Sequence, residues 1–560
     1  MTKKRKKPAV KKTKRSKRKN KKYIFISGGV ISGLGKGVTS SSIAKILQSK
    51  GLSITQVKCE MYVNVDAGTI RPTEHGEVFV CADGTETDQD IGTYERFADI
   101  ELGKENFITH GQIYNAVIKR ERNLEYNGED VEIVPHVPLE IIRRIKEAGN
   151  KSRADIIIVE LGGTVGEYQQ LLFLEADRMM KLELGNDVLN IHVAYLPIPK
   201  SIGEMKSKPA QYAVRTLYSA GIVPDIFVGR AEQPLDDQRI KVFSRNTGIG
   251  KKDIFSNPDV KSIYEVPLIL DRQHIGERIL EKLDFLKRKR KDLKDFKKLV
   301  RVIKSKKKPV KIGIVGKYFD TGDFALEDSY ISVIEAVKHA AWHFKKEPEI
   351  KWINSKDYEK SPDKIYELKK LDGVIIPGGF GKSGVEGKIK AVEFLRKNKI
   401  PFLGLCYGLQ MAVIEFARNV CKMKNANSTE VNKKTKFPVI DILPEQKEKL
   451  ANKNYGATMR LGNQTAVLEK GTMIQKIYGK NKTVERHRHR YEVNPKFIKR
   501  LQKAGIVFSG KSPNRRLMEF IELSKNIHPF FAATQAHPEF LSRPLKPHPL
   551  FREFVKCAIK

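Results

Sequence analysis

Two series of short apolar runs, each ending near glycine or a chemically reactive residue, constrain this chain more than any other feature. The first series comprises YIFIS (23–27), SITQV (53–57), DIIIVE (155–160) and DIFVG (225–229), with helical segments between the runs. Strands that alternate with helices predict a parallel sheet in an α/β fold. Open α/β sheets bind ligands at the carboxyl ends of their strands, so we expect the functional residues where these runs end.

A second series follows a charged stretch and predicts a second domain. Its runs are KIGIVG (311–316), DGVIIPGG (372–379), PFLGLC (401–406) and FFAATQAHPEF (530–540). A chain of 560 residues also exceeds what one hydrophobic core usually supports. We therefore expect domains at 23–284 and 309–560, with a linker over 285–308 whose helical apolar spacing buries little.

The first 22 residues form a basic tail that is expected to be disordered. They hold fourteen of the lysines and arginines, which leaves +25 of the formal net charge of +39 on the rest of the chain. Such a tail has the charge to contact nucleic acid or anionic lipid nonspecifically. A solvated tail without a specific partner is the favoured alternative.

Cysteine usage and hydropathy indicate a cytoplasmic protein without a membrane partner. Five cysteines, an odd number without CxxC spacing, argue against a disulfide framework and a zinc ribbon. No stretch approaches the length of a membrane span, and the lysine-rich start lacks the apolar run of a secretory signal.

The segment SGGVISGLGKGVTSSS (27–42) predicts a phosphate site between the first strand and a helix. Its glycines let backbone N–H groups approach phosphate oxygens, and Lys36 can reach the β- and γ-phosphates. The spacing is one residue longer than in a P-loop, and Gly37 stands where a magnesium-binding hydroxyl is expected. An ATP site with Mg²⁺ held by Asp88, Asp90 or Glu160 follows, although each carboxylate alone is more typical of a surface charge or helix cap.

Cys406 in PFLGLCYGLQ is a candidate nucleophile. Gly404 and Gly408 flank it at a predicted strand-to-helix turn, an arrangement that exposes a thiol at a helix N-terminus. Downstream, His537 offers a base and Glu539 a carboxylate to orient it. PGGFG (377–381) offers backbone donors for an oxyanion. Such a set performs acyl transfer through a thioester, and with glutamine the product is ammonia.

From about Tyr23 to the C-terminus, the chain resembles the CTP synthase family. Nine stretches in order carry the resemblance: GGVISGLGKG (28–37), YVNVDAGTIRPTEHGEVFV (62–80), ETDQDIGTYERF (86–97), VELGGTVGE (159–167), EMKSKPAQ (204–211), PGGFG (377–381), NANSTE (425–430), ERHRHRYEVN (485–494) and HPEF (537–540).

The resemblance implies the fold and the reaction. It implies an α/β fold with an N-terminal P-loop-type, dethiobiotin-synthetase-like parallel-sheet domain and a C-terminal class I glutamine amidotransferase domain. The first domain would use ATP to phosphorylate the uracil O4 of UTP, and ammonia would displace the phosphate at C4. The second domain would supply ammonia from glutamine through an internal tunnel. The product would be CTP, in the last step of its de novo synthesis.

The resemblance also implies roles for residues and partners. A homotetramer that stacks into filaments, CTP as feedback inhibitor and GTP as allosteric activator are implied. The nucleotide residues of one subunit would meet UTP or CTP beside a neighbouring subunit. The implied sites are: for ATP, Gly33, Leu34, Gly35, Lys36, Gly37, Val38, Lys58 and Asp90; for Mg²⁺, Asp90 and Glu160; for UTP or CTP, Ser32, Glu167, Lys206, Ser207, Lys208, Pro209, Ala210, Gln211 and Lys241; for glutamine, Gly379, Tyr407, Gly408, Leu409, Gln410, Glu430 and Arg490; and for catalysis, Cys406, His537 and Glu539.

Three departures from the family pattern stand out, one of which is the lysine-rich tail before Tyr23. The family continues GGTVG with Asp-Ile-Glu-Ser, whereas this chain has Glu167 to Gln170, near the expected pyrimidine contact. Lys382-Ser383 stands where the family has an arginine linked to GTP activation. A relative that amidates another activated oxygen acid, as cobyrinate amidases do, is the alternative enzyme. A basic RNA-binding or filament-forming protein without catalysis is the alternative of another class.

Overall fold

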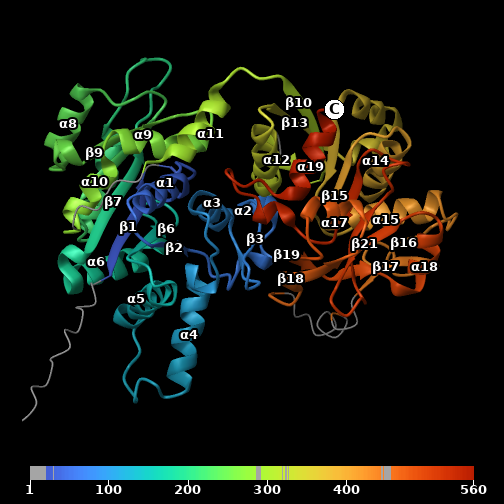
Figure 1. Cartoon of the computed structure of the whole chain (residues 1–560). Helices are drawn as coiled ribbons and strands as arrows, with labels where there is room; N and C mark the ends of the chain where they lie inside the picture. The colour runs from blue at the N-terminus through green and yellow to red at the C-terminus, as the bar shows by residue number, and fades with distance from the viewer. Residues whose placement is uncertain are drawn as a thin grey trace, which may run out of the picture.

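Two α/β lobes, joined by a short connection, make up the chain (Figure 1). The computed structural model describes residues 21–29, 31–285, 292–317, 320–321, 324–325, 327–442, 446 and 456–560. The predicted basic tail therefore lies outside the described residues, except for Lys21 and Lys22.

The first lobe contains the predicted parallel sheet. All of its seven strands pair in parallel. Their order across the sheet is β5 (Phe107–Thr109), β2 (Ile54–Glu60), β6 (Ile156–Leu161), β1 (Lys22–Gly29), β7 (Val188–Tyr195), β8 (Ile226–Ala231) and β9 (Ile254–Pro258). The four runs predicted as strands in this half of the sequence are confirmed.

Helices cover both faces of this sheet because alternate residues of each strand point to opposite sides. On β1, Ile24 and Ile26 join one buried cluster, whereas Tyr23 and Phe25 join another. The first cluster includes side chains of α1 (Lys36–Ser49), α3 (Gln89–Ala98), α9 (Val266–Arg272) and α10 (Ile275–Lys282). The second includes side chains of α4 (His110–Arg122), α5 (Ile133–Ser152) and α6 (Leu171–Leu184). Two further helices, α7 (Lys208–Ser219) and α8 (Asp237–Thr247), pack beside β7 and β8.

The segment read as a solvated linker buries more than its charge suggests. Residues 286–291 lie outside the described residues, but α11 (Lys294–Lys304) is a helix whose Phe296 and Leu299 join the core of the first lobe. Its apolar residues recur at helical spacing, so a narrow stripe is buried while the lysines stay exposed. Trp342 of the second lobe joins the same cluster, so the connection is packed against both lobes.

The second lobe contains a nine-stranded mixed sheet. Its strands run in the order β13 (Glu347–Asn354), β10 (Pro309–Gly316), β14 (Gly373–Ile376), β15 (Phe402–Leu405), β23 (Phe531–Thr534), β22 (Met518–Glu522), β21 (Val507–Lys511), β18 (Arg460–Leu468) and β19 (Lys482–His489). The five strands from β13 to β23 are parallel and include the four predicted runs. The remaining pairs are antiparallel.

Helices again cover both faces of this sheet, which places the carboxyl ends of β14, β15 and β23 together. One face packs α14 (Val385–Lys397), α15 (Tyr407–Asn419) and α18 (Pro495–Lys503). The other packs α12 (Ile331–His343), α17 (Met473–Tyr478) and α19 (Pro549–Ala558). A small sheet of β16 (Asn427–Ser428), β17 (Pro438–Ile442) and β20 (Tyr491–Val493) lies beside α15.

Buried ion pairs and an aromatic pair join the two lobes near β19, where α2 (Pro72–His75), α3 and β3 (Phe79–Val80) meet the second lobe (Figure 1). Glu95 of α3 accepts from Arg543 across 2.6 Å and from Arg486 across 3.1 Å. The rings of Phe79 and Phe540 lie 4.9 Å apart. The short strands β3 and β4 (Glu86–Thr87) therefore bring the first lobe directly against the second.

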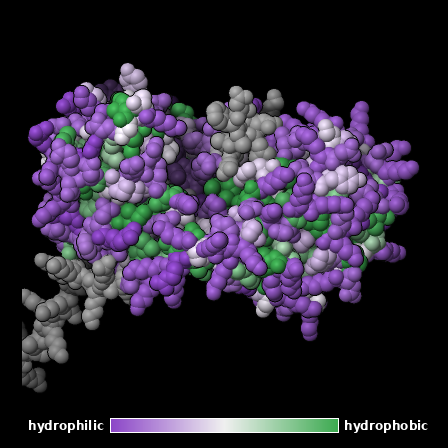
Figure 2. Space-filling view, turned by 90° about the horizontal axis from the view of Figure 1, so that it is seen from above, coloured by the Kyte–Doolittle hydropathy of each residue, from purple (hydrophilic) through white to green (hydrophobic). Residues whose placement is uncertain are grey.

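The exterior is largely hydrophilic. Figure 2 shows hydrophilic side chains over most of the face seen from above, with hydrophobic ones in small scattered patches. Within the described residues, none of the helices combines the length and apolar character needed to span a bilayer.

Candidate functional site: a nucleotide cavity and a glutaminase centre

The phosphate loop has the predicted position between β1 and α1. Gly33 and Gly35 adopt φ angles of 69° and 85°, which side-chain-bearing residues rarely take. Gly35 caps α1, so the N-terminus of that helix, with its partial positive charge, begins at Lys36. The Lys36 ammonium donates to Gly163 O. Burial and the nearby Lys58 lower the pKa of Lys36.

Lys58, at the carboxyl end of β2, gathers the acidic residues of this site. Its Nζ lies 3.1 Å from Glu160 Oε1, 3.2 Å from Glu60 Oε1 and in contact with Asp90. Although burial disfavours the ammonium, the Asp90 and Glu160 carboxylates raise the pKa of Lys58 well above its usual value. Burial would raise the pKa of Asp90, but Lys58 lowers it; burial raises the pKa of Glu160 despite Lys58.

These groups line one cavity of about 560 Å³. The cavity wall contains eleven of the predicted nucleotide and metal residues: Ser32, Gly33, Leu34, Gly35, Lys36, Gly37, Val38, Lys58, Asp90, Glu160 and Glu167. Glu60, His75 and Asp88 also line it, and their ligand atoms lie within 4.8 Å of one another. Sequence reasoning missed Glu60 and His75; the run predicted there stops at residue 57, whereas β2 continues to Glu60.

The remaining residues predicted for UTP or CTP lie outside the cavity wall. Lys206 forms a 2.7 Å ion pair with Glu204, and Lys241 is exposed on α8. The others, Ser207, Lys208, Pro209, Ala210 and Gln211, form the start of α7 and the residue before it.

Cys406 occupies the predicted sharp turn between β15 and α15. Its φ of 49° is strained for a residue with a side chain, which is typical of a nucleophile held at a strand-to-helix elbow. A Cβ at Gly408 would lie 2.1 Å from Ile376 O, and one at Gly404 would lie 2.8 Å from the Gly408 carbonyl carbon. The flanking glycines are therefore required by close packing of the elbow.

His537 and Glu539 complete the predicted set at the end of β23. His537 Nδ1 and Glu539 Oε1 lie 2.7 Å apart. Although burial favours the neutral ring, the charges of Glu539 and Cys406 raise the pKa of His537 to about 10. The imidazole is therefore expected to be protonated beside the thiol at neutral pH.

Two neighbours of the thiol were not predicted from the sequence. Gln535 Nε2 donates to Cys406 Sγ across 3.5 Å, and the thiol donates to Arg488 O across 3.7 Å. Gln535 is the first residue after β23, so its place near the thiol follows from that strand. The contact of Arg488 depends instead on where β19 lies relative to Cys406.

Most of the residues predicted for glutamine lie at the same elbow or next to it. Glu430 accepts from Gly381 N across 2.6 Å, and Tyr407 OH donates to Gly381 O across 2.7 Å. Arg490 donates to Gln446 and Thr458. The others are Gly379, beside His537, and Gly408, Leu409 and Gln410 in the first turn of α15.

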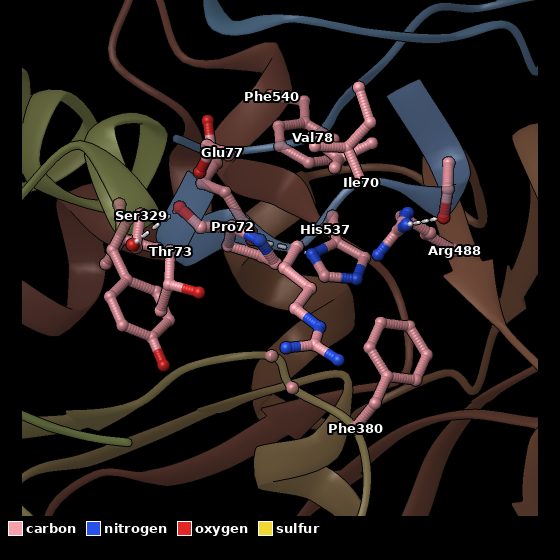
Figure 3. Close-up of a pocket in the computed structure, with 17 residues that line it drawn as sticks. Ile70, Pro72, Thr73, Glu77, Val78, Ser329, Phe380, Arg488, His537 and Phe540 are labelled. Atoms are coloured by element: carbon pink, nitrogen blue, oxygen red, sulfur yellow. Dashed lines mark hydrogen bonds and ion pairs between the residues drawn. The ribbon is translucent and has the colours of Figure 1, made fainter. Parts of the chain in front are cut away.

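A cavity of about 400 Å³ lies between the lobes and reaches the glutaminase residues. Figure 3 shows the His537 ring inside it, with Phe380 and Arg488 to one side. Its wall combines Gly378, Gly379, His537 and Glu539 of the second lobe with Pro72, Glu77 and Val78 of the first.

A parallel-sheet domain with a phosphate loop, joined to a domain with a Cys–His–Glu centre, defines a glutamine-dependent amidotransferase. Comparison with known proteins supports both halves. The family model for the CTP synthase N-terminus matches residues 22–285, and that for class I glutamine amidotransferases matches residues 325–557.

Curated relatives extend this likeness over nearly the whole chain. The CTP synthase of Methanococcus aeolicus is 47% identical over 96% of this chain and 99% of its own length. That of Pyrococcus furiosus is 46% identical over 96% and 98%. Among solved structures, the glutaminase domain of Trypanosoma brucei CTPS with bound acivicin is 37% identical, with a TM-score of 0.41 over 45% of this chain and 94% of its own. The chain belongs to the CTP synthase family. The amidase and noncatalytic alternatives are left without support.

Proposed function

We propose that the two sites act in series, so that the C-terminal domain releases ammonia from glutamine and the N-terminal domain consumes it. The chain catalyses the glutamine-dependent amination of UTP to CTP, as a ligase that uses ATP. The observation that carries the arrangement is the interdomain cavity, whose wall combines His537 with residues of the first lobe.

In the glutaminase half, Cys406 acts as the nucleophile and His537 as the proton carrier. Because Glu539 and Cys406 keep the pKa of His537 near 10, the thiol proton moves to the imidazole and leaves a thiolate. The thiolate attacks the side-chain amide carbon of glutamine, and His537 returns the proton to the leaving nitrogen. Ammonia departs, and water then hydrolyses the thioester to glutamate.

Backbone N–H groups near Gly379 and at the start of α15 are suited to stabilise the oxyanion that forms in this attack. Glu430 and Arg490 offer a carboxylate and a guanidinium, which match the α-amino and α-carboxylate groups of glutamine.

Ammonia then crosses the cavity between the lobes. Val78 and Pro72 offer apolar walls, and Glu77 is buried. A path between the lobes limits the contact of ammonia with bulk water, where it would be protonated, and ammonium has no lone pair with which to attack a carbon.

In the synthase half, phosphorylation of the uracil O4 by ATP supplies a leaving group that ammonia displaces at C4. Lys36 and Lys58 offset the charge on the transferring phosphoryl group. Asp90 and Glu160 offer carboxylate oxygens, the ligands that Mg²⁺ prefers. Four carboxylates pair with the single ammonium of Lys58, so negative charge exceeds positive charge around it. The residues thus fit Mg²⁺, which when bound would neutralise phosphate charge.

The remaining nucleotide residues support a shared site in a homotetramer. Lys206 to Gln211 and Lys241 would bind UTP, or inhibitory CTP, beside a neighbouring subunit. An apolar cavity between α4 and α5, with Ile118 and Ile133 59% and 65% exposed, is suited to be covered by such a neighbour. The proposal extends to stacking of tetramers into filaments and to activation by GTP. Lys382-Ser383 stands at the position linked to GTP activation.

ATP-dependent CTP formation from UTP, with glutamine or ammonium as nitrogen source, tests the two-site arrangement. Cys406→Ala should lose only the glutamine reaction, because ammonium bypasses the thiol. Lys36→Ala should lose both reactions, because each needs the phosphoryl transfer. Loss of the ammonium reaction in a folded Cys406→Ala protein would contradict the separation of the sites.

A further inference from the structure

Lys388, on α14 behind the glutaminase elbow, is a buried lysine that the mechanism above leaves unused. Its side chain has no exposed surface, and within the described residues no acceptor bonds to its Nζ. Other buried lysines near the two sites have partners: Lys58 contacts carboxylates, and Lys36 donates to a carbonyl. Because an unpaired buried ammonium is strongly disfavoured, a lysine in this place calls for an explanation.

The Lys388 amine lies against the residue that follows the nucleophile. Its Nζ is 5.3 Å from the centroid of the Tyr407 ring, and Lys317 Nζ is 5.2 Å from the same centroid. The Tyr407 hydroxyl in turn donates to Gly381 O in the PGGFG segment. Lys388 thus contacts the ring that joins the nucleophile elbow to the predicted oxyanion segment.

Of the two charged groups that shift the pKa of Lys388, Lys317 is positive and Cys406 is negative. Burial and the charge of Lys317, after β10, lower the pKa of Lys388 well below its usual value, whereas Cys406 acts in the opposite direction. On α13 (Asp357–Lys360), Glu359 accepts from Gly387 N. Two other acids nearby are also engaged: Glu386 pairs with Arg418 of α15, and Glu367 accepts from Tyr358.

We propose that Lys388 is a positioning residue of the glutaminase, whose amine binds a proton when negative charge develops at Cys406 and thereby stabilises that charge. The proton comes from solvent and returns to it when the thioester is hydrolysed, while the thiol proton follows its separate path through His537. Lys388 therefore responds to the charge at the elbow without touching glutamine.

The test measures the pH dependence of Cys406 alkylation by iodoacetamide in the full chain, read by peptide mass spectrometry so that Cys421 and Cys557 do not interfere. In Lys388→Met, the midpoint of this profile should move upward by about one pH unit, a tenfold loss of thiolate below the midpoint. The kcat with glutamine at neutral pH should fall about tenfold, with less than a twofold change in KM. CTP formation from ammonium should stay unchanged.

Lys397→Met, an exposed substitution on the same helix, is the matched control and should leave the profile unmoved. Lys388→Gln provides the same neutral comparison if methionine prevents folding. A folded neutral variant that keeps the wild-type alkylation profile, or that loses ammonium-dependent activity equally, would overturn the proposal. Because the inference rests on Cys406 as the nucleophile, wild-type alkylation must abolish the glutamine reaction; if it does not, the proposed function fails instead.

Discussion

Replacing Arg486 by methionine tests how the synthase domain holds the glutaminase centre in place. Arg486 is fully buried on β19, donates to Val80 O across 3.1 Å and lies 3.0 Å from Glu95 Oε2. Its own carbonyl accepts from His537 N across 2.7 Å. One residue therefore bonds to the synthase domain through its side chain and to His537 through its backbone.

The expected loss of stability follows from these contacts. Removing one partner of a buried ion pair costs about 3–5 kcal/mol. Glu95 keeps Arg543, 2.6 Å away, so we expect the lower limit of about 3 kcal/mol. Methionine retains apolar contact with the Phe79 ring, over which the guanidinium lies. At about 2–4 °C per kcal/mol for large domains, the midpoint of thermal unfolding should fall by about 6–12 °C.

The assay compares thermal unfolding with the ratio of glutamine-dependent to ammonium-dependent CTP formation. The ratio should fall in Arg486→Met. The carbonyl of residue 486 that accepts from His537 N is then held less rigidly, while the nucleotide cavity stays intact. Arg516→Met, at an exposed position in the connection between β21 and β22, should change neither quantity. An unchanged unfolding midpoint together with an unchanged ratio would refute the reasoning.

Two pH-dependent predictions follow from buried acids. Burial raises the pKa of Glu77 to about 8. The contribution of Glu77 to the free energy of unfolding is therefore fully present below pH 4.5 and is lost as the pH rises to about 8. In denaturant titrations Glu77→Gln should flatten this pH dependence, whereas Glu74→Gln, at an exposed position, should not. Glu539→Gln should lower the pKa of His537 from about 10, and the glutamine reaction should fall by at least about 100-fold with the ammonium reaction retained. Equal loss of both reactions would contradict the role of Glu539.

The sequence predicts well what depends on local pattern. Alternating strands and helices identify both parallel sheets, and the glycines around Lys36 and Cys406 identify both turns, because each turn needs backbone conformations that glycine permits. The charged run after Asp284 misleads, since its lysines outweigh a buried stripe containing Phe296 and Leu299.

What the sequence leaves open depends on contacts between distant segments. The acids around Lys58 come from β2, β6 and the start of α3, and no local pattern states that Glu60 joins them. Likewise, Lys388 reads as one more surface lysine of an amphipathic helix until α15 is packed against it. Lys206 and Lys241 stay predictions because their proposed ligand lies beside another subunit.

The alternation in ERHRHR explains how one strand serves both domains. On β19, successive side chains point to opposite faces, so Arg486 and Arg488 reach Glu95 and Glu86 of the synthase domain. His487 and His489 point the other way and lie 3.6 Å from buried Glu519 and Glu492. The backbone of the two arginines meanwhile accepts from His537 N and the Cys406 thiol. Any displacement of the synthase domain that moves Glu86 or Glu95 therefore pulls on the strand whose backbone holds His537 and Cys406.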